Sequence, residues 1–157
     1  MLVPAAMVLL ADQASKLWAT SALSGGERVT VIPRLIQFRL TFNPGAAFSI
    51  GAGATWVFTL TTAAAVVGVL YYGRRSHSTT WTVVLGALLG GAVSHLLDRL
   101  FREPGFARGH VVDFIDYGPF VGNVADIVLV GSCALLMLLS LRGVPFEAPV
   151  DEERPPS

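Results

Sequence analysis

The sequence predicts an all-α membrane protein with four transmembrane helices and a small β-sheet in its first long loop. Hydrophobic residues make up 53% of the 157 residues and charged residues only 14%, whereas about a quarter of a typical soluble domain is charged. The charged residues also leave long gaps, each close to the roughly 20 residues that cross the hydrocarbon core as a helix. A short stretch between the first two gaps alternates apolar and polar residues, which is the period of a strand.

Four segments are long enough to cross a membrane and hold few charges: residues 1–23, 52–72, 78–97 and 119–141. The second and third contain no Asp, Glu, Lys or Arg, and the last contains only Asp126. The first is interrupted by Asp12 and Lys16. It could also be a signal peptide, although it lacks the basic residues that precede the apolar stretch of such a segment.

Four spans fix the sides of the connecting loops. Residues 24–51 and 98–118 lie on one face of the membrane, and residues 73–77 lie with both termini on the other. Apolar and polar residues alternate over 35–42, which predicts a strand that pairs with residues 28–32 along the membrane surface.

We expect one membrane-embedded domain over residues 1–142. Residues 143–157 are rich in Pro, Ser and acidic side chains, and they should form a disordered tail. The long-loop face holds six Lys or Arg residues and the other face four, a count that favours long loops in the cytoplasm. Arg74 and Arg75 are concentrated in a very short loop, so the count alone does not decide the orientation.

Composition argues against several functions. Eleven basic and eleven acidic residues cancel, so there is no basic field to hold nucleic acid. Cys133 is the single cysteine and cannot form an internal disulfide or a metal cluster on its own. The three histidines are scattered, and neither H-E-x-x-H nor G-x-S-x-G occurs. The residues therefore give no support for metal or serine chemistry.

Five polar islands interrupt the apolar sequence, at residues 12–16, 43–48, 98–99, 111–114 and 123–126. If the third helix begins near Thr80, Asp98 lies about 27 Å along it, at the long-loop face. Asp126 would lie only about 8 Å below the same face if the fourth helix begins near Val121. Asn43 and Asp113 belong to the long loops themselves. We therefore expect one site built from every part of the chain.

Asp113 and Asp126 are the candidates for chemistry, because neither has a basic residue at helical spacing. Asn123 lies three residues before Asp126 and is a neutral donor that can orient its carboxylate. Two carboxylates close together share one proton, so one can activate water while the other protonates a substrate. Asp116 lies near Asp113 and remains an alternative partner.

The other charged residues should hold the site together. Asp12 and Lys16 are four residues apart and can neutralise each other on one helix face. Asp98 and Arg99 can each pair with another helix. On the third predicted helix, small residues recur every four positions, at Gly86, Gly90 and Ser94. Such a face lets another helix approach closely.

The islands DQASK, FNPGAAFS, GGAVSHLLDR, VVDF and GNVAD, in this order and spacing, resemble the lipoprotein signal peptidase family, the type II signal peptidases of bacteria. The resemblance covers about residues 8–140. It implies a four-helix aspartic endopeptidase of the cytoplasmic (inner) membrane, with both termini in the cytoplasm and the sheet and active site near the outer face. The implied substrate is a prolipoprotein with diacylglycerol on its cysteine, cut just before that cysteine. Neither a metal nor an organic cofactor is implied, and we expect a monomer in contact with membrane lipid.

By motif, the resemblance assigns Asp113 and Asp126 as the catalytic pair. It also assigns supporting or substrate-binding positions, at Asp12, Lys16, Asn43, Gly45, His95, Asp98, Arg99 and Asn123. One departure is that Ser94-His95 stands where the family pattern usually reads Gly-Asn. Because His95 lies three residues before Asp98 and four before Arg99, we expect its ring to orient one of them.

Two further expectations follow from the first predicted helix. Asp12 lies only about 15 Å along this helix, near the middle of the membrane, unless further residues precede Met1. A different class of function would use Asp12 and Asp126 as the proton relay of a small proton-coupled carrier. Such carriers usually have more spans or an internal repeat, and the sequence shows no repeat.

Overall fold

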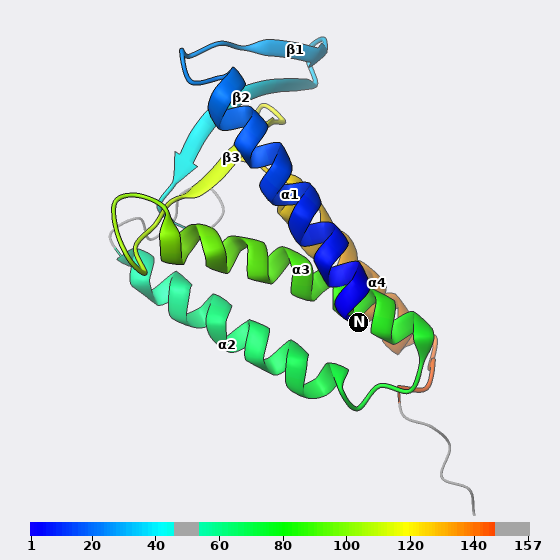
Figure 1. The fold of residues 1–157 in the computed structure, drawn as a ribbon. Helices are drawn as coiled ribbons and strands as arrows, with labels where there is room; N and C mark the ends of the chain where they lie inside the picture. Colours follow the sequence, from blue (N-terminus) through cyan, green and yellow to red (C-terminus); the bar gives the residue numbers. More distant parts are fainter. Residues whose placement is uncertain (46–53, 147–157) are drawn as a thin grey trace, which may run out of the picture.

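The computed structural model of the protein describes residues 1–45 and 54–146. In this part the chain forms a helical bundle with a small antiparallel sheet at one end (Figure 1). The helices are α1 (Leu2–Ala22), α2 (Thr55–Gly73), α3 (Thr79–Phe101) and α4 (Val124–Leu141). Helix α3 packs against each of the other three. Helix α1 begins and α4 ends at the end of the bundle away from the sheet (Figure 1).

Three of the described helices, α2, α3 and α4, are long and apolar enough to cross a membrane. Helix α1 has the predicted position and length, but its polar residues Asp12, Gln13, Ser15 and Lys16 lower its mean hydropathy. The structure therefore confirms a mostly helical membrane-type fold, and the crossing of the membrane by α1 stays a prediction.

Two helix boundaries differ from the prediction. Helix α3 continues past residue 97 to Phe101, so Asp98 and Arg99 lie in its last turns and not beyond its end. Helix α4 begins at Val124 and not at residue 119, because Asn123 caps it. Residues 52 and 53 of the predicted second span lie outside the described residues.

The sheet contains the predicted strand pair and two further strands. Strands β1 (Val29–Ile32) and β2 (Ile36–Asn43) pair antiparallel, as the alternation indicated. The prediction of a sheet confined to the first long loop was wrong, because β3 (Val111–Asp116) and β4 (Val121–Gly122) from the second loop continue it in the order β1-β2-β3-β4. The first five residues of β3 are all buried, so β3 lacks the alternation that marks a strand with one solvated face.

An aromatic cluster fixes the sheet to the end of α1. Trp18 meets Phe38 of β2 and Phe114 of β3 edge to face, with ring centroids 5.4 and 6.0 Å apart. Beside them, Ala19 and Leu23 are buried in the same core. Such edge-to-face contacts add about 0.5–1.5 kcal/mol each to the burial of the rings. The cluster therefore holds β3, the strand that carries Asp113, in a fixed place over the bundle.

The predicted small-residue face of α3 is the contact surface for α1. A β-carbon at Gly90 would collide with the carbonyl oxygen of Ala5, and a β-carbon at Gly86 would collide with Met1 and Pro4. One turn further on, Ser94 donates a hydrogen bond to Asp12 of α1. This close approach lets the polar side chains of the two helices meet.

We expect Gly90→Ala and Gly131→Ala to change stability in opposite directions. Alanine at Gly131 of α4 meets no atom within 4 Å and should stabilise the helix by roughly 1 kcal/mol. At Gly90 the added methyl meets backbone that cannot move aside without displacing α1, which should cost about 1–3 kcal/mol. Thermal unfolding of the purified variants measures both effects. An unchanged or raised midpoint for Gly90→Ala would contradict the packing of α1 on α3.

Residues 143–146 pack on the start of α3. The indole Nε1 of Trp81 donates to the carbonyl oxygen of Val144 over 3.1 Å, and its ring meets Phe146 edge to face. The rest of the predicted tail, residues 147–157, lies outside the described residues.

Candidate active site

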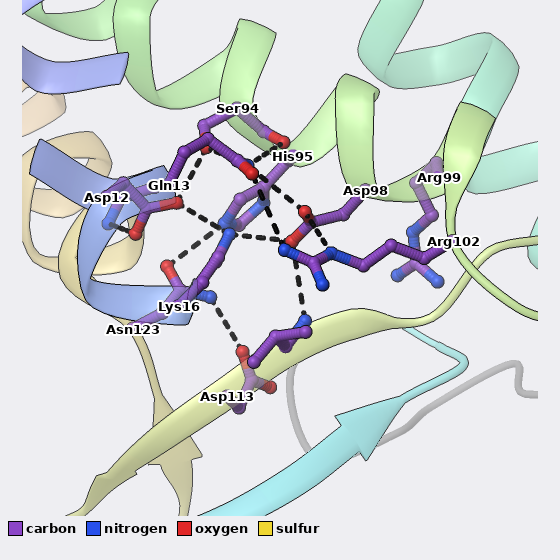
Figure 2. Close-up of polar contacts among 12 residues, drawn as sticks. Asp12, Gln13, Lys16, Ser94, His95, Asp98, Arg99, Arg102, Asp113 and Asn123 are labelled. Carbon is purple, nitrogen blue, oxygen red and sulfur yellow. Dashed lines mark hydrogen bonds and ion pairs between the residues drawn. The ribbon is translucent and has the colours of Figure 1, made fainter. Parts of the chain in front are cut away.

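Four of the polar islands, residues 12–16, 98–99, 111–114 and 123–126, meet where α1, α3, β3 and the start of α4 come together (Figure 2). Residues 46–48 of the remaining island lie outside the described residues. At the centre lies Lys16, whose Nζ is 2.6 Å from a carboxylate oxygen of Asp12 and 2.7 Å from one of Asp98. All three side chains are at most 1% exposed. The predicted pairing of Asp12 with Lys16 is confirmed, and Asp98 pairs with another helix, as expected. Arg102 adds a second cation, 2.7 Å from the other oxygen of Asp98.

This buried network fixes two neighbouring elements through backbone contacts. The second carboxylate oxygen of Asp12 accepts from the backbone N–H of Ala125 over 2.8 Å. Ala125 lies in the first turn of α4, where unpaired N–H groups favour a negative partner. Asp98 accepts from the backbone N–H of Val112, directly before Asp113. The network therefore sets the positions of the two elements that carry Asp113 and Asp126.

Two members of the network were missed in the sequence. Gln13 donates to the hydroxyl oxygen of Ser94 over 2.8 Å and to Asp98 over 3.1 Å, and it accepts from Arg102 (Figure 2). Gln13 lies inside the first polar island, and Arg102 lies four residues after Asp98. Both signals were present, but an uncharged amide and a loop arginine do not stand out by composition.

Arg99 holds the two long loops together. Its guanidinium donates to the carbonyl oxygens of Asn43 and Gly109 over 3.1 and 3.2 Å, and also to that of Gly45. Asn43 ends β2, and Gly109 precedes β3, so one side chain joins the ends of adjacent strands. Arg99 was expected to be architectural and to pair with another helix; its partners are instead carbonyl oxygens of the two long loops.

Asp113 lies buried in β3 between two amide donors. Its oxygens accept from the Asn123 side chain over 2.6 Å and from the Asn43 side chain over 3.0 Å. Burial, and after it the negative charge of Asp126, raise the pKa of Asp113 to about 7 against the opposing effect of the two amides. Asp113 therefore holds its proton in acidic solution and releases it near neutral pH.

Asp126 lies in the first turn of α4, and its side chain is 38% exposed. Its carboxylate accepts from the backbone N–H of Asn123 over 3.0 Å, and its own N–H donates to the Asn123 side-chain oxygen. These two bonds form a capping box, which satisfies N–H groups that the helix start leaves free.

The expected role of Asn123 needs correction. Its amide was predicted to donate to Asp126, but it donates to Asp113 (Figure 2). Its side-chain oxygen instead accepts from the backbone N–H of Asp126. The need to cap α4 sets the orientation of the Asn123 amide, because its side-chain oxygen must accept from the backbone N–H of Asp126. One amide therefore contacts both candidate catalytic residues.

His95 also departs from the expectation. Its Nε2 lies 3.3 Å from the side-chain oxygen of Asn123 and 3.4 Å from a carboxylate oxygen of Asp126. The prediction that it orients Asp98 or Arg99 was wrong. Asp98 and Arg99 lie toward α1 and the loops, whereas the ring of His95 points to α4.

A cavity of about 460 Å³ is lined by six of the ten predicted site residues, and Asp12, Lys16, Asp98 and Asn123 are not in its lining. Asp113, Asp126, His95 and Arg99 contribute its polar lining. The remaining wall is largely apolar, with Phe58, Thr62, Phe120, Leu129 and Val130. Asn43 and Gly45 also line it. A polar pair in a mostly apolar cavity is typical of a small site for substrate.

Asp116 does not face this cavity. It lies three residues after Asp113 on the same strand, and residues an odd number apart point to opposite faces. Its carboxylate accepts from the backbone N–H of Gly118 over 2.8 Å and pairs with Arg39 at 2.6 Å. The Gly118 N–H, and then Arg39, hold the pKa of Asp116 below its usual value. Asp116 is therefore a paired surface carboxylate and not the partner of Asp113 or Asp126.

Comparison with known proteins agrees with this arrangement. The family model for signal peptidase II matches residues 4–142. The lipoprotein signal peptidase of Leifsonia xyli subsp. xyli is 45% identical over 147 residues, which are 92% of this chain and 68% of that protein. The lipoprotein signal peptidase of Bifidobacterium longum subsp. infantis is 46% identical over 142 residues, which are 90% of this chain and 78% of that protein.

Two solved bacterial membrane enzymes share the fold. One superposes with a TM-score of 0.79 at 24% identity, over 96% of this chain and 93% of the other. The second has a TM-score of 0.75 at 25% identity, over 89% of this chain and 91% of the other. Together with the family match over most of its length, these similarities show that the chain belongs to the signal peptidase II family.

Proposed function

We propose that this chain is a membrane-embedded aspartic endopeptidase. It removes the signal peptide from diacylglyceryl-modified prolipoproteins and cuts just before the lipidated cysteine. The family and the names of its relatives support the substrate class. The observation that carries the mechanism is the pair Asp113 and Asp126, which come from different elements and line one cavity, with Asp113 buried and Asp126 partly exposed.

The pair supplies both halves of acid–base catalysis. With Asp113 protonated, the negative charge of the pair rests on Asp126, which takes a proton from water. The water oxygen bonds to the scissile carbonyl carbon, while Asp113 donates its proton to the carbonyl oxygen. When the tetrahedral intermediate collapses, Asp113 recovers that proton, Asp126 gives its proton to the departing nitrogen, and the carbon–nitrogen bond breaks. Both carboxyl groups return to their starting states.

The placement of polar residues in α1 supports a fourth span. Its charged residues, Asp12 and Lys16, are fully buried. Its outward face is apolar, with side chains 64–71% exposed at Leu2, Val3, Met7, Leu10 and Leu17. The mean hydropathy of α1 is an average over all its faces, including the buried polar one, but only the outward apolar face would contact lipid. We therefore propose four spans.

The ends of the bundle suggest the orientation. The start of α1 and the end of α4 lie together, away from the sheet (Figure 1). Both long loops and the candidate active site lie at the sheet end. We propose that this end is near the outer face of the bacterial cytoplasmic membrane and that both termini are in the cytoplasm.

Cleavage of a lipidated peptide tests the function. The protein is reconstituted in liposomes with a fluorogenic peptide that carries the diacylglyceryl cysteine, and the unlipidated peptide is the control. We expect cleavage of the lipidated peptide only.

The carrier alternative needs Asp12 as a proton relay, but the Asp12 carboxylate is fixed by Lys16, Ser94 and the N–H of Ala125. Proton-driven uptake without cleavage would overturn the peptidase proposal.

The rate should have a bell-shaped dependence on pH. Because the pKa of Asp113 is about 7, kcat/KM should fall as the pH rises through this value and the acid loses its proton. It should also fall in acid, where the pair takes up its second proton. Both limbs belong to the coupled pair. Initial rates over the acid and neutral range measure them, and a rate that keeps rising well above neutral pH would exclude Asp113 as the acid.

A further inference from the structure

His95 is placed to act on both candidate catalytic residues without touching the reacting bond. It lies on α3, and its side chain is 19% exposed at the edge of the cavity. Its Nε2 is 3.3 Å from the side-chain oxygen of Asn123 and 3.4 Å from a carboxylate oxygen of Asp126. Asn123 in turn donates to Asp113 over 2.6 Å. Nε2 of His95 therefore contacts the Asn123 side chain, which itself contacts both Asp113 and Asp126.

The contacts of Asn123 determine which group donates. Its side-chain oxygen accepts from the N–H of Asp126, and its nitrogen donates to Asp113. The amide cannot be turned around without placing two donors against each other at Asp126. The Nε2 of His95 therefore faces two acceptors, an amide oxygen and a carboxylate oxygen, and must itself carry hydrogen.

This donor role does not depend on the charge of the ring. The charged groups around His95 are Asp126 on α4 and the ion pair of Asp12 and Lys16 on α1. Lys16 is balanced by Asp12 and Asp98. Nε2 carries hydrogen in one neutral tautomer and in the imidazolium ion alike. The direction of the hydrogen bond is the same in both states.

We propose that His95 is a positioning residue of the peptidase, whose Nε2–H is shared between Asn123 and Asp126 and fixes the carboxylate that activates water. The inference rests on the proposed function. The same bond holds the Asn123 oxygen toward α4 and so keeps its amide nitrogen on Asp113. The sequence departs from the usual family pattern at this position, so the role belongs to this chain's own residue.

Two substitutions of equal length separate donation from packing. In glutamine the amide nitrogen is as many bonds from the backbone as Nε2 of histidine, and methionine has the same length without a donor. We expect His95→Gln to keep kcat within about threefold of the original value. His95→Met should lower kcat by on the order of 5- to 150-fold, the range for the loss of the hydrogen bond that His95 donates to Asn123 and Asp126.

The pH profile distinguishes positioning from a structural role. A hydrogen bond donated to Asp126 opposes the uptake of a second proton by the catalytic pair, so His95→Met should move the acid limb of the kcat/KM profile to higher pH and leave KM little changed. His95→Gln should restore the original limb. The control pair is His77→Gln and His77→Met, at an exposed position at the other end of α3, where both should match the original protein. Equal kcat and equal profiles for the two His95 variants would overturn the proposal.

Nitrogen NMR of the histidine rings tests the proposal without cleavage. We expect the His95 ring, identified by its absence in His95→Gln, to carry hydrogen on Nε2 and to shift in Asp126→Asn. A ring with hydrogen on Nδ1 alone would overturn the positioning role even if the protein cleaves its substrate. If the His95 ring carries hydrogen on Nε2 but the protein cleaves no lipidated peptide, the hydrogen bond of His95 is supported and the proposed function is refuted.

Discussion

Asparagine in place of Asp113 or Asp126 is expected to abolish cleavage, with a loss of at least about 100- to 10,000-fold in kcat for each. Asparagine keeps the size and polarity of aspartate but cannot exchange a proton at working pH. Asp113 is the buried acid with a pKa of about 7, and Asp126 is its more exposed partner on the same cavity. The measurement is cleavage of the lipidated peptide by purified variants whose helix content and unfolding midpoint have been checked.

Asp116→Asn is the matched control for this prediction. It makes the same chemical change three residues from Asp113 on the same strand, but on the opposite face, where it weakens the contact with Arg39 and keeps an oxygen that can accept from the Gly118 N–H. Surface ion pairs of this kind contribute about 0–1 kcal/mol. We expect near-normal cleavage. An inactive Asp116→Asn variant together with an active Asp113→Asn variant would show that the pair has been assigned wrongly.

Lys16→Met should have the largest effect on stability. Lys16 is fully buried between Asp12 and Asp98, which are themselves buried. Removing one member of a buried ion pair leaves an uncompensated charge and typically costs about 3–5 kcal/mol. The start of α4 and β3 are bonded to these two carboxylates, so activity should be lost with the fold. Thermal unfolding and the yield of inserted protein measure the effect.

Two comparisons separate charge loss from a general effect of methionine. Arg74→Met removes an exposed cation beyond the end of α2, and it should leave the unfolding midpoint nearly unchanged. Adding Asp12→Asn to Lys16→Met should recover part of the lost stability, because one uncompensated charge is removed as well. A Lys16→Met protein as stable as the original would mean that the buried network does not hold the bundle together.

The helices and the polar islands could be predicted from the sequence because the hydrocarbon core of a membrane restricts both the length and the charge of the segments that cross it. The thickness of this core sets the length of a spanning helix. Because a charged side chain inside it costs free energy, most polar residues found there are paired or functional. Asp12 and Lys16 could be paired by helical spacing alone. The placing of Asp98 and Asp126 near one face followed from the rise per residue, and that of Asp113 from its position in a long loop.

What the sequence did not reveal depends on contacts between distant elements. Strand β3 is buried on both faces, so the alternation that identified β2 is absent. The capping requirement of α4 turns the amide of Asn123 toward Asp113, and spacing along one helix carries no information on that choice. The ring of His95 turns to α4, which helical spacing relative to Asp98 could not show.

Mass spectrometry of the cleavage products tests most directly the claim that Asp113 and Asp126 hydrolyse a peptide bond of a lipid-modified protein. Purified protein in lipid is incubated with the lipidated peptide in isotopically labelled water, with EDTA present. We predict two products, one that begins with the lipidated cysteine and one that ends just before it with a water oxygen in its new carboxylate. Neither product should form with Asp113→Asn or Asp126→Asn. The same products from either variant, or cleavage at another bond, would contradict the claim.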